Sequence, residues 1–128
     1  MSLKDYFEGV QGTGVLATAS ATGKVNAAIY GRPHFIDEHT IAFIMADRLT
    51  HANLQENDSA VYLFRETGDR YVGKRLYLTR TSETDDPQTI GEVRSHQHHG
   101  DRAKNTDVPR YLVYFRIDAV LPLIGSGK

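Results

Sequence analysis

The sequence contains no cysteine, no long apolar run and no excess of charge of either sign. Without cysteine the chain can form no disulfide bond, no thiolate metal site and no cysteine nucleophile. Its apolar runs are too short to cross a membrane, and residues 1–6 lack the basic and apolar regions of a signal peptide. We therefore expect a cytoplasmic protein without a membrane-spanning helix.

Charge and length narrow the class of protein further. The 15 lysines and arginines nearly balance the 16 acidic residues, and the formal net charge is −1. This balance argues against a protein that binds the phosphate backbone of nucleic acids, because such proteins normally carry a basic surface. With 128 residues the chain is expected to form one domain, residues 1–128, of a size at which a dimer interface often adds to a small core.

The most informative segment runs from residue 41 to residue 64 and predicts a strand, a helix and a second strand. Its first apolar run, 41–46, is short and rich in β-branched and aromatic residues, which is typical of a buried strand. A helix is expected from Thr50 to about Asn57, and the apolar run 60–64 predicts the next strand. The start of this helix therefore lies at the end of a buried strand.

The predicted helix start has the features of an anion site. Thr50 is expected to be the N-cap, because its hydroxyl can accept a hydrogen bond from a free backbone N–H group of the first turn. Leu49 before it and Leu54 after it have the spacing of a hydrophobic staple. The guanidinium of Arg48 adds to the positive end of the helix dipole, a combination suited to a phosphate group. On this segment alone, a helix start that binds only water stays open as the alternative.

Elsewhere the alternation of apolar and polar residues predicts an antiparallel barrel of about six short strands with short helices. A strand that begins at residue 25 has two faces, with Val25, Ala27 and Ile29 on one and Asn26, Ala28, Tyr30 and Arg32 on the other. The other expected elements are a helix near residues 3–10 that ends at Gly12 or Gly14, strands at 14–20, 71–81 and 110–120, turns at 21–24 and 37–39, a helix from Pro87 to about His98, a charged connection at 99–108, and an apolar tail at 121–128.

Three segments together resemble one known family. They are residues 13–19 (TGVLATA), residues 23–34 (GKVNAAIYGRPH) and the segment 41–64. In order and spacing they resemble the pyridoxamine 5′-phosphate oxidase-like family, the FMN-binding split barrels. The resemblance covers about residues 6–77 well and the rest loosely. It implies a mainly β fold with short helices, an antiparallel split β-barrel, and a homodimer with the flavin at the subunit interface.

The same resemblance implies which residues hold the FMN. The flavin would lie along Asn26, Ala27, Ala28, Tyr30, Met45 and Ala46. Its phosphate would lie at the segment that follows, which consists of Asp47, Arg48, Leu49, Thr50 and His51. Many relatives have an Arg-Lys or Lys-Thr pair at the positions of Leu49 and Thr50, and because only the threonine is kept here, Arg48 is expected to supply the cation. Residues 121–124 of the partner subunit would form another wall of the flavin slot. Without the resemblance, Tyr30 and Met45 are expected to be ordinary core residues.

No catalytic or metal-binding constellation stands out from the residues. His96, His98 and His99 lack a carboxylate at ligand spacing on the same helical face, so we expect an exposed, histidine-rich helix end and no metal site. The chain has no glycine-rich phosphate loop, dinucleotide fingerprint or hydrolase elbow. It also lacks the C-terminal Arg-Leu-x-Pro segment of pyridoxamine 5′-phosphate oxidases proper. Any oxidoreductase chemistry would therefore come from the flavin, with a small-molecule substrate and an electron donor that the sequence leaves open.

Three alternatives stay open. The same fold can hold a deazaflavin, or haem with His34 or a C-terminal histidine as the iron ligand. A small barrel can also bind single-stranded nucleic acid through exposed aromatic residues such as Tyr71, Tyr77, Tyr111 and Tyr114, although the near-zero net charge counts against it. The third alternative is a cofactor-free barrel that binds a partner protein.

Overall fold

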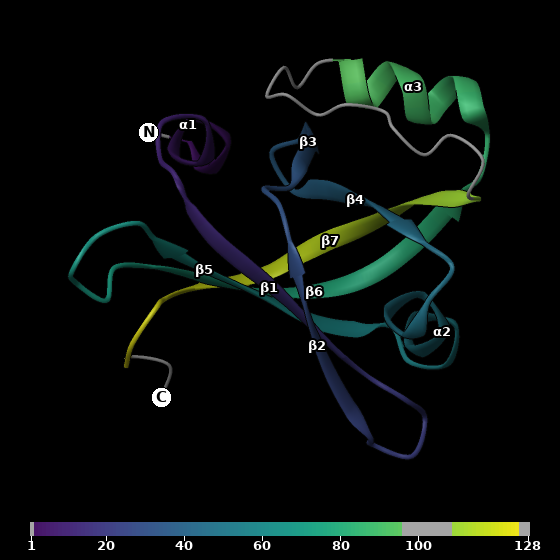
Figure 1. Cartoon of the computed structure of the whole chain (residues 1–128), viewed down its shortest axis with the longest axis horizontal. Coiled ribbons are helices and arrows are strands. Elements are labelled where there is room, and N and C mark those ends of the chain that lie inside the picture. The colour runs from purple at the N-terminus through teal and green to yellow at the C-terminus, as the bar shows by residue number, and fades with distance from the viewer. Residues whose placement is uncertain (1, 96–108, 126–128) are drawn as a thin grey trace.

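The computed structural model describes residues 2–95 and 109–125, and in them seven strands form one antiparallel sheet (Figure 1). The strands are β1 (Gly12–Ala19), β2 (Val25–Tyr30), β3 (His34–Asp37), β4 (Thr40–Ala46), β5 (Ser59–Glu66), β6 (Gly73–Thr84) and β7 (Arg110–Pro122). The helices are α1 (Leu3–Glu8), α2 (Leu49–Glu56) and α3 (Pro87–Ser95). No helix in this described part of the chain is both long and apolar enough to cross a membrane.

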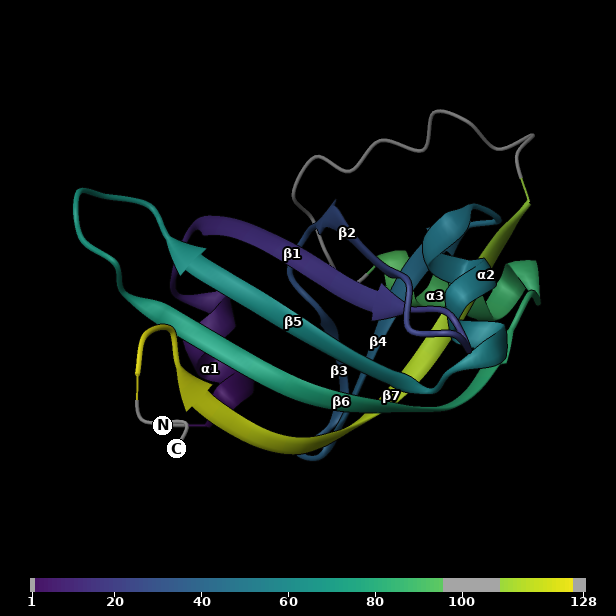
Figure 2. The same ribbon diagram turned by 90° about the horizontal axis from the view of Figure 1, so that it is seen from below.

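The strand order explains why the sheet curls. The order is β2-β1-β5-β6-β7-β4-β3, so β2 and β3 are the two edges of the sheet. These edge strands are nevertheless consecutive in the chain and are joined only by residues 31–33. Because so short a link connects opposite edges, the sheet has to bend round into a barrel. Figure 2 shows β1, β5, β6 and β7 as successive neighbours in this curved sheet, with α1 toward one end and α2 toward the other. The prediction of a mainly β, antiparallel barrel is confirmed.

The inward faces of the strands supply a single large core. β7 buries Val113 and Phe115 completely, and β6 buries Leu76 and Leu78, as their alternation predicts. Further buried members are Leu16, Ile41, Phe43, Met45, Leu54, Tyr62 and Phe64. α3 packs on β4 and β7 through a smaller cluster, in which Ile90 is 7% exposed. This buried framework carries the end of β4 and the start of α2.

α1 covers one end of the barrel. Its Phe7 is 2% exposed, and Arg32 donates hydrogen bonds to the carbonyl oxygens of Phe7 and Val10 over 2.9 and 3.0 Å. The helix ends at Glu8, because the backbone N–H of Gly9 already bonds to the carbonyls of the preceding turn. The expected end at Gly12 or Gly14 is therefore wrong, since both glycines belong to β1.

β2 ends at Tyr30, so Arg32 lies beyond the strand in which the sequence places it. Pro33 has no backbone N–H to donate, and the chain leaves the sheet at residues 31–33 before β3 begins. By contrast, the helix start before Pro87 is confirmed, since Asp86 Oδ2 accepts from the Thr89 N–H over 3.1 Å. The expected extension of this helix to His98 and the connection 99–108 lie outside the described residues.

Candidate functional site

The short turn between β4 and α2 forms the centre of the candidate site. Arg48 is the N-cap residue of α2, with an extended backbone (φ −130°), and its N–H donates to the Ala46 carbonyl over 2.9 Å. No side chain of the cap bonds to the first turn of the helix. The N-cap side chain therefore leaves the backbone N–H groups at the positive end of α2 without a hydrogen bond from it. These groups lie directly beside Arg48, which carries a guanidinium.

The structure corrects the predicted start of this helix. Thr50 is not the N-cap, because α2 begins one residue earlier and Thr50 lies inside its first turn. The staple is wrong as well, since Leu49 is 58% exposed whereas Leu54 is fully buried. The shift leaves the Thr50 hydroxyl, which would have capped the helix, available for contacts with another element.

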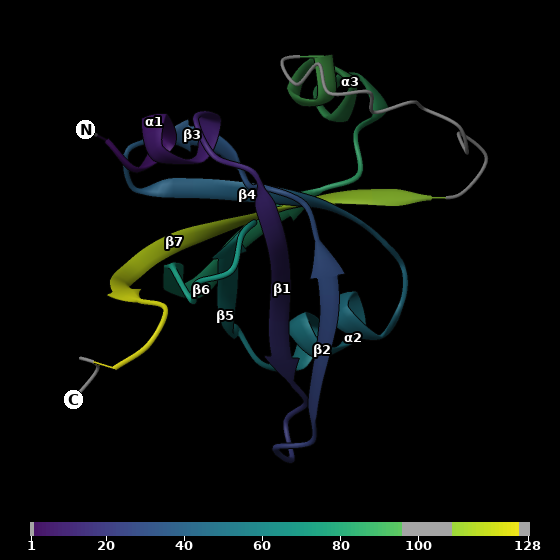
Figure 3. The same cartoon turned by 60° about the vertical axis from the view of Figure 1, so that its left-hand side comes forward.

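That element is β2. Asn26 Nδ2 donates to Thr50 Oγ1 over 3.3 Å, and the Thr50 side chain also forms a hydrogen bond with the Tyr30 hydroxyl. Figure 3 shows α2 beside β2, on the part of the β1–β2 hairpin that points away from α1. The fold thus brings together three residues expected at the cofactor, Asn26, Tyr30 and Thr50, although Asn26 and Thr50 are 24 residues apart in the sequence.

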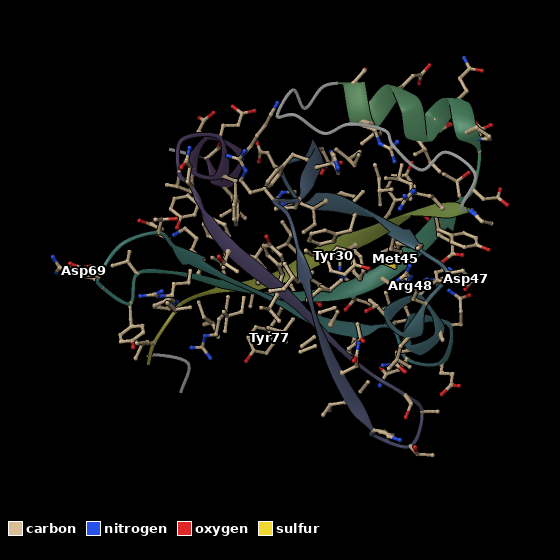
Figure 4. All side chains as sticks on the ribbon, viewed as in Figure 1. Tyr30, Met45, Asp47, Arg48, Asp69 and Tyr77 are labelled. Carbon is tan, nitrogen blue, oxygen red and sulfur yellow. The ribbon has the colours of Figure 1, made fainter. Side chains whose placement is uncertain are left out.

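Arg48 lies close enough to Tyr30 for its positive charge to affect the pKa of the tyrosine hydroxyl. Burial raises the pKa of the Tyr30 hydroxyl, while the Thr50 hydrogen bond and the positive charge of Arg48 act in the opposite direction. Figure 4 shows Tyr30, Met45 and Arg48 near one another around the end of β4, far from Asp69 at the tip of the β5–β6 loop. The site therefore combines one cation, two hydroxyls and one amide at a helix start.

The other residues expected at the cofactor occupy different surroundings. Met45 is 2% exposed and packs in the core, so its side chain can support the residues of the site but does not reach the surface at which a ligand would bind. Ala46 and Ala28 are half-buried, whereas Ala27 is exposed on the opposite face of β2. Leu49 points to solvent. The alternation of β2 thus places Asn26, Ala28 and Tyr30 toward α2, as the sequence predicts, and turns Ala27 away.

Asp47 and His51 form a separate cluster on the other side of the helix start. His51 is 6% exposed, and its ring nitrogens lie 3.1 Å from Asp47 Oδ1 and 3.0 Å from Glu83 Oε2. Its ring stacks on Tyr111 of β7, with a centroid separation of 4.0 Å. His51 therefore faces β6 and β7, whereas Thr50 faces β2.

Three residues that hold this region were not expected from the sequence. Glu83 and Tyr111 surround His51, and Asn53 donates from α2 to Thr18 of β1 over 3.1 Å. The contacts of Glu83 and Tyr111 depend on the pairing of β6 with β7 and of β7 with β4, which no local pattern reveals. Asn53 had a usable signal, since a polar residue on the helix face beside the buried Leu54 needs a hydrogen-bond partner.

Comparisons with known proteins give matches in structure alone. No protein-family model and no curated protein matches the sequence. Among solved structures, the chain is similar to an FMN-binding protein from Syntrophomonas wolfei, with a TM-score of 0.76 and 20% identity over 94% of this chain and 82% of that one. It is also similar to HupZ of Group A Streptococcus, with a TM-score of 0.72 and 18% identity over 94% of this chain and 90% of that one.

A third similar structure is a candidate pyridoxamine 5′-phosphate oxidase from Listeria innocua, with a TM-score of 0.66 and 14% identity over 94% of both chains. The TM-scores show that the fold is shared. At identities this low, the choice of ligand has to be argued from the residues of the site. The chain has the split-barrel fold of pyridoxamine 5′-phosphate oxidase-like proteins.

Proposed function

We propose that the protein binds FMN, with the phosphate group at the start of α2 and the ring system along β2. The observation that carries this proposal is that Arg48, Thr50 and Tyr30 lie together at the start of α2, where the N-cap side chain forms no hydrogen bond with the first turn. A guanidinium, a hydroxyl and free N–H groups match the several acceptor oxygens of a phosphate monoester. The FMN-binding protein of the same fold supports this choice of ligand.

FMN, when bound, supplies electron or hydride transfer, so we propose a flavin-dependent oxidoreductase acting with a small-molecule partner. The chain's own residues bind and orient the cofactor. Arg48 neutralises the phosphate, Thr50 and Asn26 fix the distance between α2 and β2, and the half-buried Tyr30 lines the slot. Met45 supports this wall from the core.

We further propose a homodimer that forms on the outer face of the sheet. Residues directly opposite each other in an antiparallel pair point to the same face, which places two apolar rows side by side, one across β2, β1 and β5 and the other across β2, β1, β5 and β6. One row is Ile29, Val15 and Leu63, and the other is Ala27, Ala17, Val61 and Tyr77. Val25 and Ile29, at 78% and 71% exposed, are the most exposed large apolar residues of the described chain. An apolar face of this extent is typical of an interface.

The test is the visible absorption spectrum of the purified protein, followed by the mass of the chromophore released on denaturation. We expect a flavin spectrum and the mass of FMN. If the protein is colourless, the apoprotein is titrated with FMN and its melting temperature is followed. No chromophore together with no thermal shift would contradict the proposal, as would a released deazaflavin or haem.

A further inference from the structure

The side chain of Tyr62 on β5 reaches over β1 to the end of β2. It is completely buried, and its hydroxyl donates to the Gly31 carbonyl oxygen over 2.8 Å, with the Tyr30 carbonyl oxygen 3.4 Å away. Gly31 is the first residue beyond β2, at the point where the chain leaves the sheet toward β3. A buried hydroxyl therefore holds the backbone next to the side chain that is proposed to line the flavin slot.

The sequence of β1 leaves room for this contact. Gly14 is paired with Tyr30 across the β1–β2 ladder, and a Cβ atom at residue 14 would overlap with the Tyr62 hydroxyl. The same Cβ would lie 2.7 Å from the Tyr30 carbonyl oxygen, closer than real Cβ contacts come. Because any larger residue would displace the hydroxyl or the carbonyl, Gly14 and Tyr62 together fix the end of β2.

The ring of Tyr30 is held from the same side of the core. The Phe43 ring on β4 has its centroid 5.0 Å from that of Tyr62 and 5.6 Å from that of Tyr30, and it meets the Tyr30 ring edge to face. On its other side, the Tyr30 hydroxyl forms a hydrogen bond with the Thr50 side chain of α2. A shift of the backbone at residues 30 and 31 would therefore move the Tyr30 ring relative to α2.

The Tyr62 hydroxyl acts as the donor in its contact with β2. A carbonyl oxygen can only accept, so the proton has to come from the hydroxyl. Burial raises the pKa of this hydroxyl and outweighs the opposite effect of the positive charge of Arg32, so the proton is kept. Phenylalanine at position 62 would fill the same space without this donor.

We propose that Tyr62 is a positioning residue of the flavin site, which sets the place of Tyr30 in the slot through the backbone of residues 30 and 31. This inference rests on the proposed FMN function. Tyr62 itself lies in the core and acts through Tyr30, so it takes no part in the flavin chemistry. Without the hydroxyl, the end of β2 is in the binding position for only a fraction of the time, and the affinity falls by that fraction.

The test measures dissociation constants of FMN and riboflavin for wild type and Tyr62→Phe. Riboflavin lacks the phosphate, so it reports on the ring slot without the contacts at the start of α2. Tyr6→Phe is the matched control, because it also removes one tyrosine hydroxyl, which donates to Glu66 Oε2 over 2.6 Å on the α1 side of the barrel.

A double-mutant cycle with Tyr30→Leu separates positioning from a general loosening of the fold. If Tyr62 acts through Tyr30, Tyr62→Phe has little further effect on flavin affinity once residue 30 is leucine. The melting temperature of the apoprotein is measured for the same variants. A purely structural role of Tyr62 lowers that temperature but leaves the affinity of the folded protein unchanged.

We expect Tyr62→Phe to lower the affinities for FMN and riboflavin alike, by about three- to tenfold, the range set by the net contribution of one hydrogen bond. Tyr6→Phe should leave both affinities unchanged. Unchanged affinities in Tyr62→Phe, an equal loss in Tyr6→Phe, a loss confined to FMN, or an undiminished loss in the Tyr30→Leu background overturns this inference alone. Failure of both ligands to bind wild type overturns the proposed function as well.

Discussion

The side-chain amide of Asn26 on β2 donates to the hydroxyl of Thr50 on α2 over 3.3 Å. One turn further along the helix, Asn53 donates in the opposite direction to Thr18 on β1 over 3.1 Å. Because Thr18 and Asn26 are paired across the β1–β2 ladder, the two bonds are neighbours. They attach α2 to the hairpin and thereby set the position of Arg48 relative to Tyr30.

Replacement of Thr50 by valine removes the hydroxyl while keeping the shape of the side chain. Thr50 is 5% exposed, so the Asn26 amide loses its partner in a poorly hydrated place. We expect a loss of about 1–2 kcal/mol in the free energy of unfolding, measured with urea. Thr50→Ser keeps the hydroxyl and serves as the control. Equal stability of the valine and serine variants would contradict the role given to this hydrogen bond.

Replacement of Arg48 by alanine removes the proposed phosphate cation from an exposed turn. A hydrogen bond to a charged group contributes about 1.5–3 kcal/mol, so we expect FMN affinity to fall about 10- to 100-fold. Riboflavin affinity and the melting temperature of the apoprotein should change little. Arg70→Ala, in the β5–β6 loop, controls for the loss of one positive charge. An equal loss of affinity for FMN and riboflavin would argue against a contact with the phosphate.

Burial raises the pKa of Glu83, but hydrogen bonds from His51, Gln55 and Arg80 outweigh it and hold the pKa below its ordinary value, which predicts a specific acid sensitivity. A carboxyl group whose pKa is lower in the folded state stabilises the fold above its unfolded pKa and loses that effect as the pH falls through the folded value. The difference in unfolding free energy between wild type and Glu83→Gln should therefore be largest above the reference value of 4.5 and shrink below it. Glu38→Gln, in an exposed turn, is the control. A difference that stays constant across this range would contradict the assignment.

A charge on the outer sheet face should prevent dimer formation. Ile29 lies at the β2 end of one apolar row, and burying a glutamate there without a partner is unfavourable. We expect wild type to elute as a dimer and Ile29→Glu as a folded monomer, with masses measured by light scattering. Ile36→Glu provides a matched control, since Ile36 is 45% exposed on β3, away from this face. A dimer that survives Ile29→Glu would place the interface elsewhere.

The strands and helices were predictable because their signals are local. Alternation identified the two faces of β2, and the position of Asp86 before Pro87 identified the start of α3. The resemblance to split barrels placed Asn26, Tyr30, Arg48 and Thr50 in one site, and the structure brings these four residues together.

The contacts that were missed depend on residues far apart in the sequence. Thr50 has the local features of an N-cap, but its hydroxyl bonds to Asn26 and Tyr30 instead, so the helix begins earlier. His51 was expected at the phosphate, yet it contacts Glu83, which is 32 residues away. Such contacts follow from the strand order β6-β7-β4, and that order is a property of the whole barrel.

The most direct test of the central claim is the set of backbone amide shifts in ¹⁵N-labelled protein titrated with FMN and, separately, with riboflavin. We expect both ligands to shift the amides of residues 26–30, and FMN alone to shift strongly those of residues 48–51 at the start of α2. FMN-specific shifts confined to another part of the barrel, with residues 48–51 unchanged, would contradict a phosphate site at this helix start.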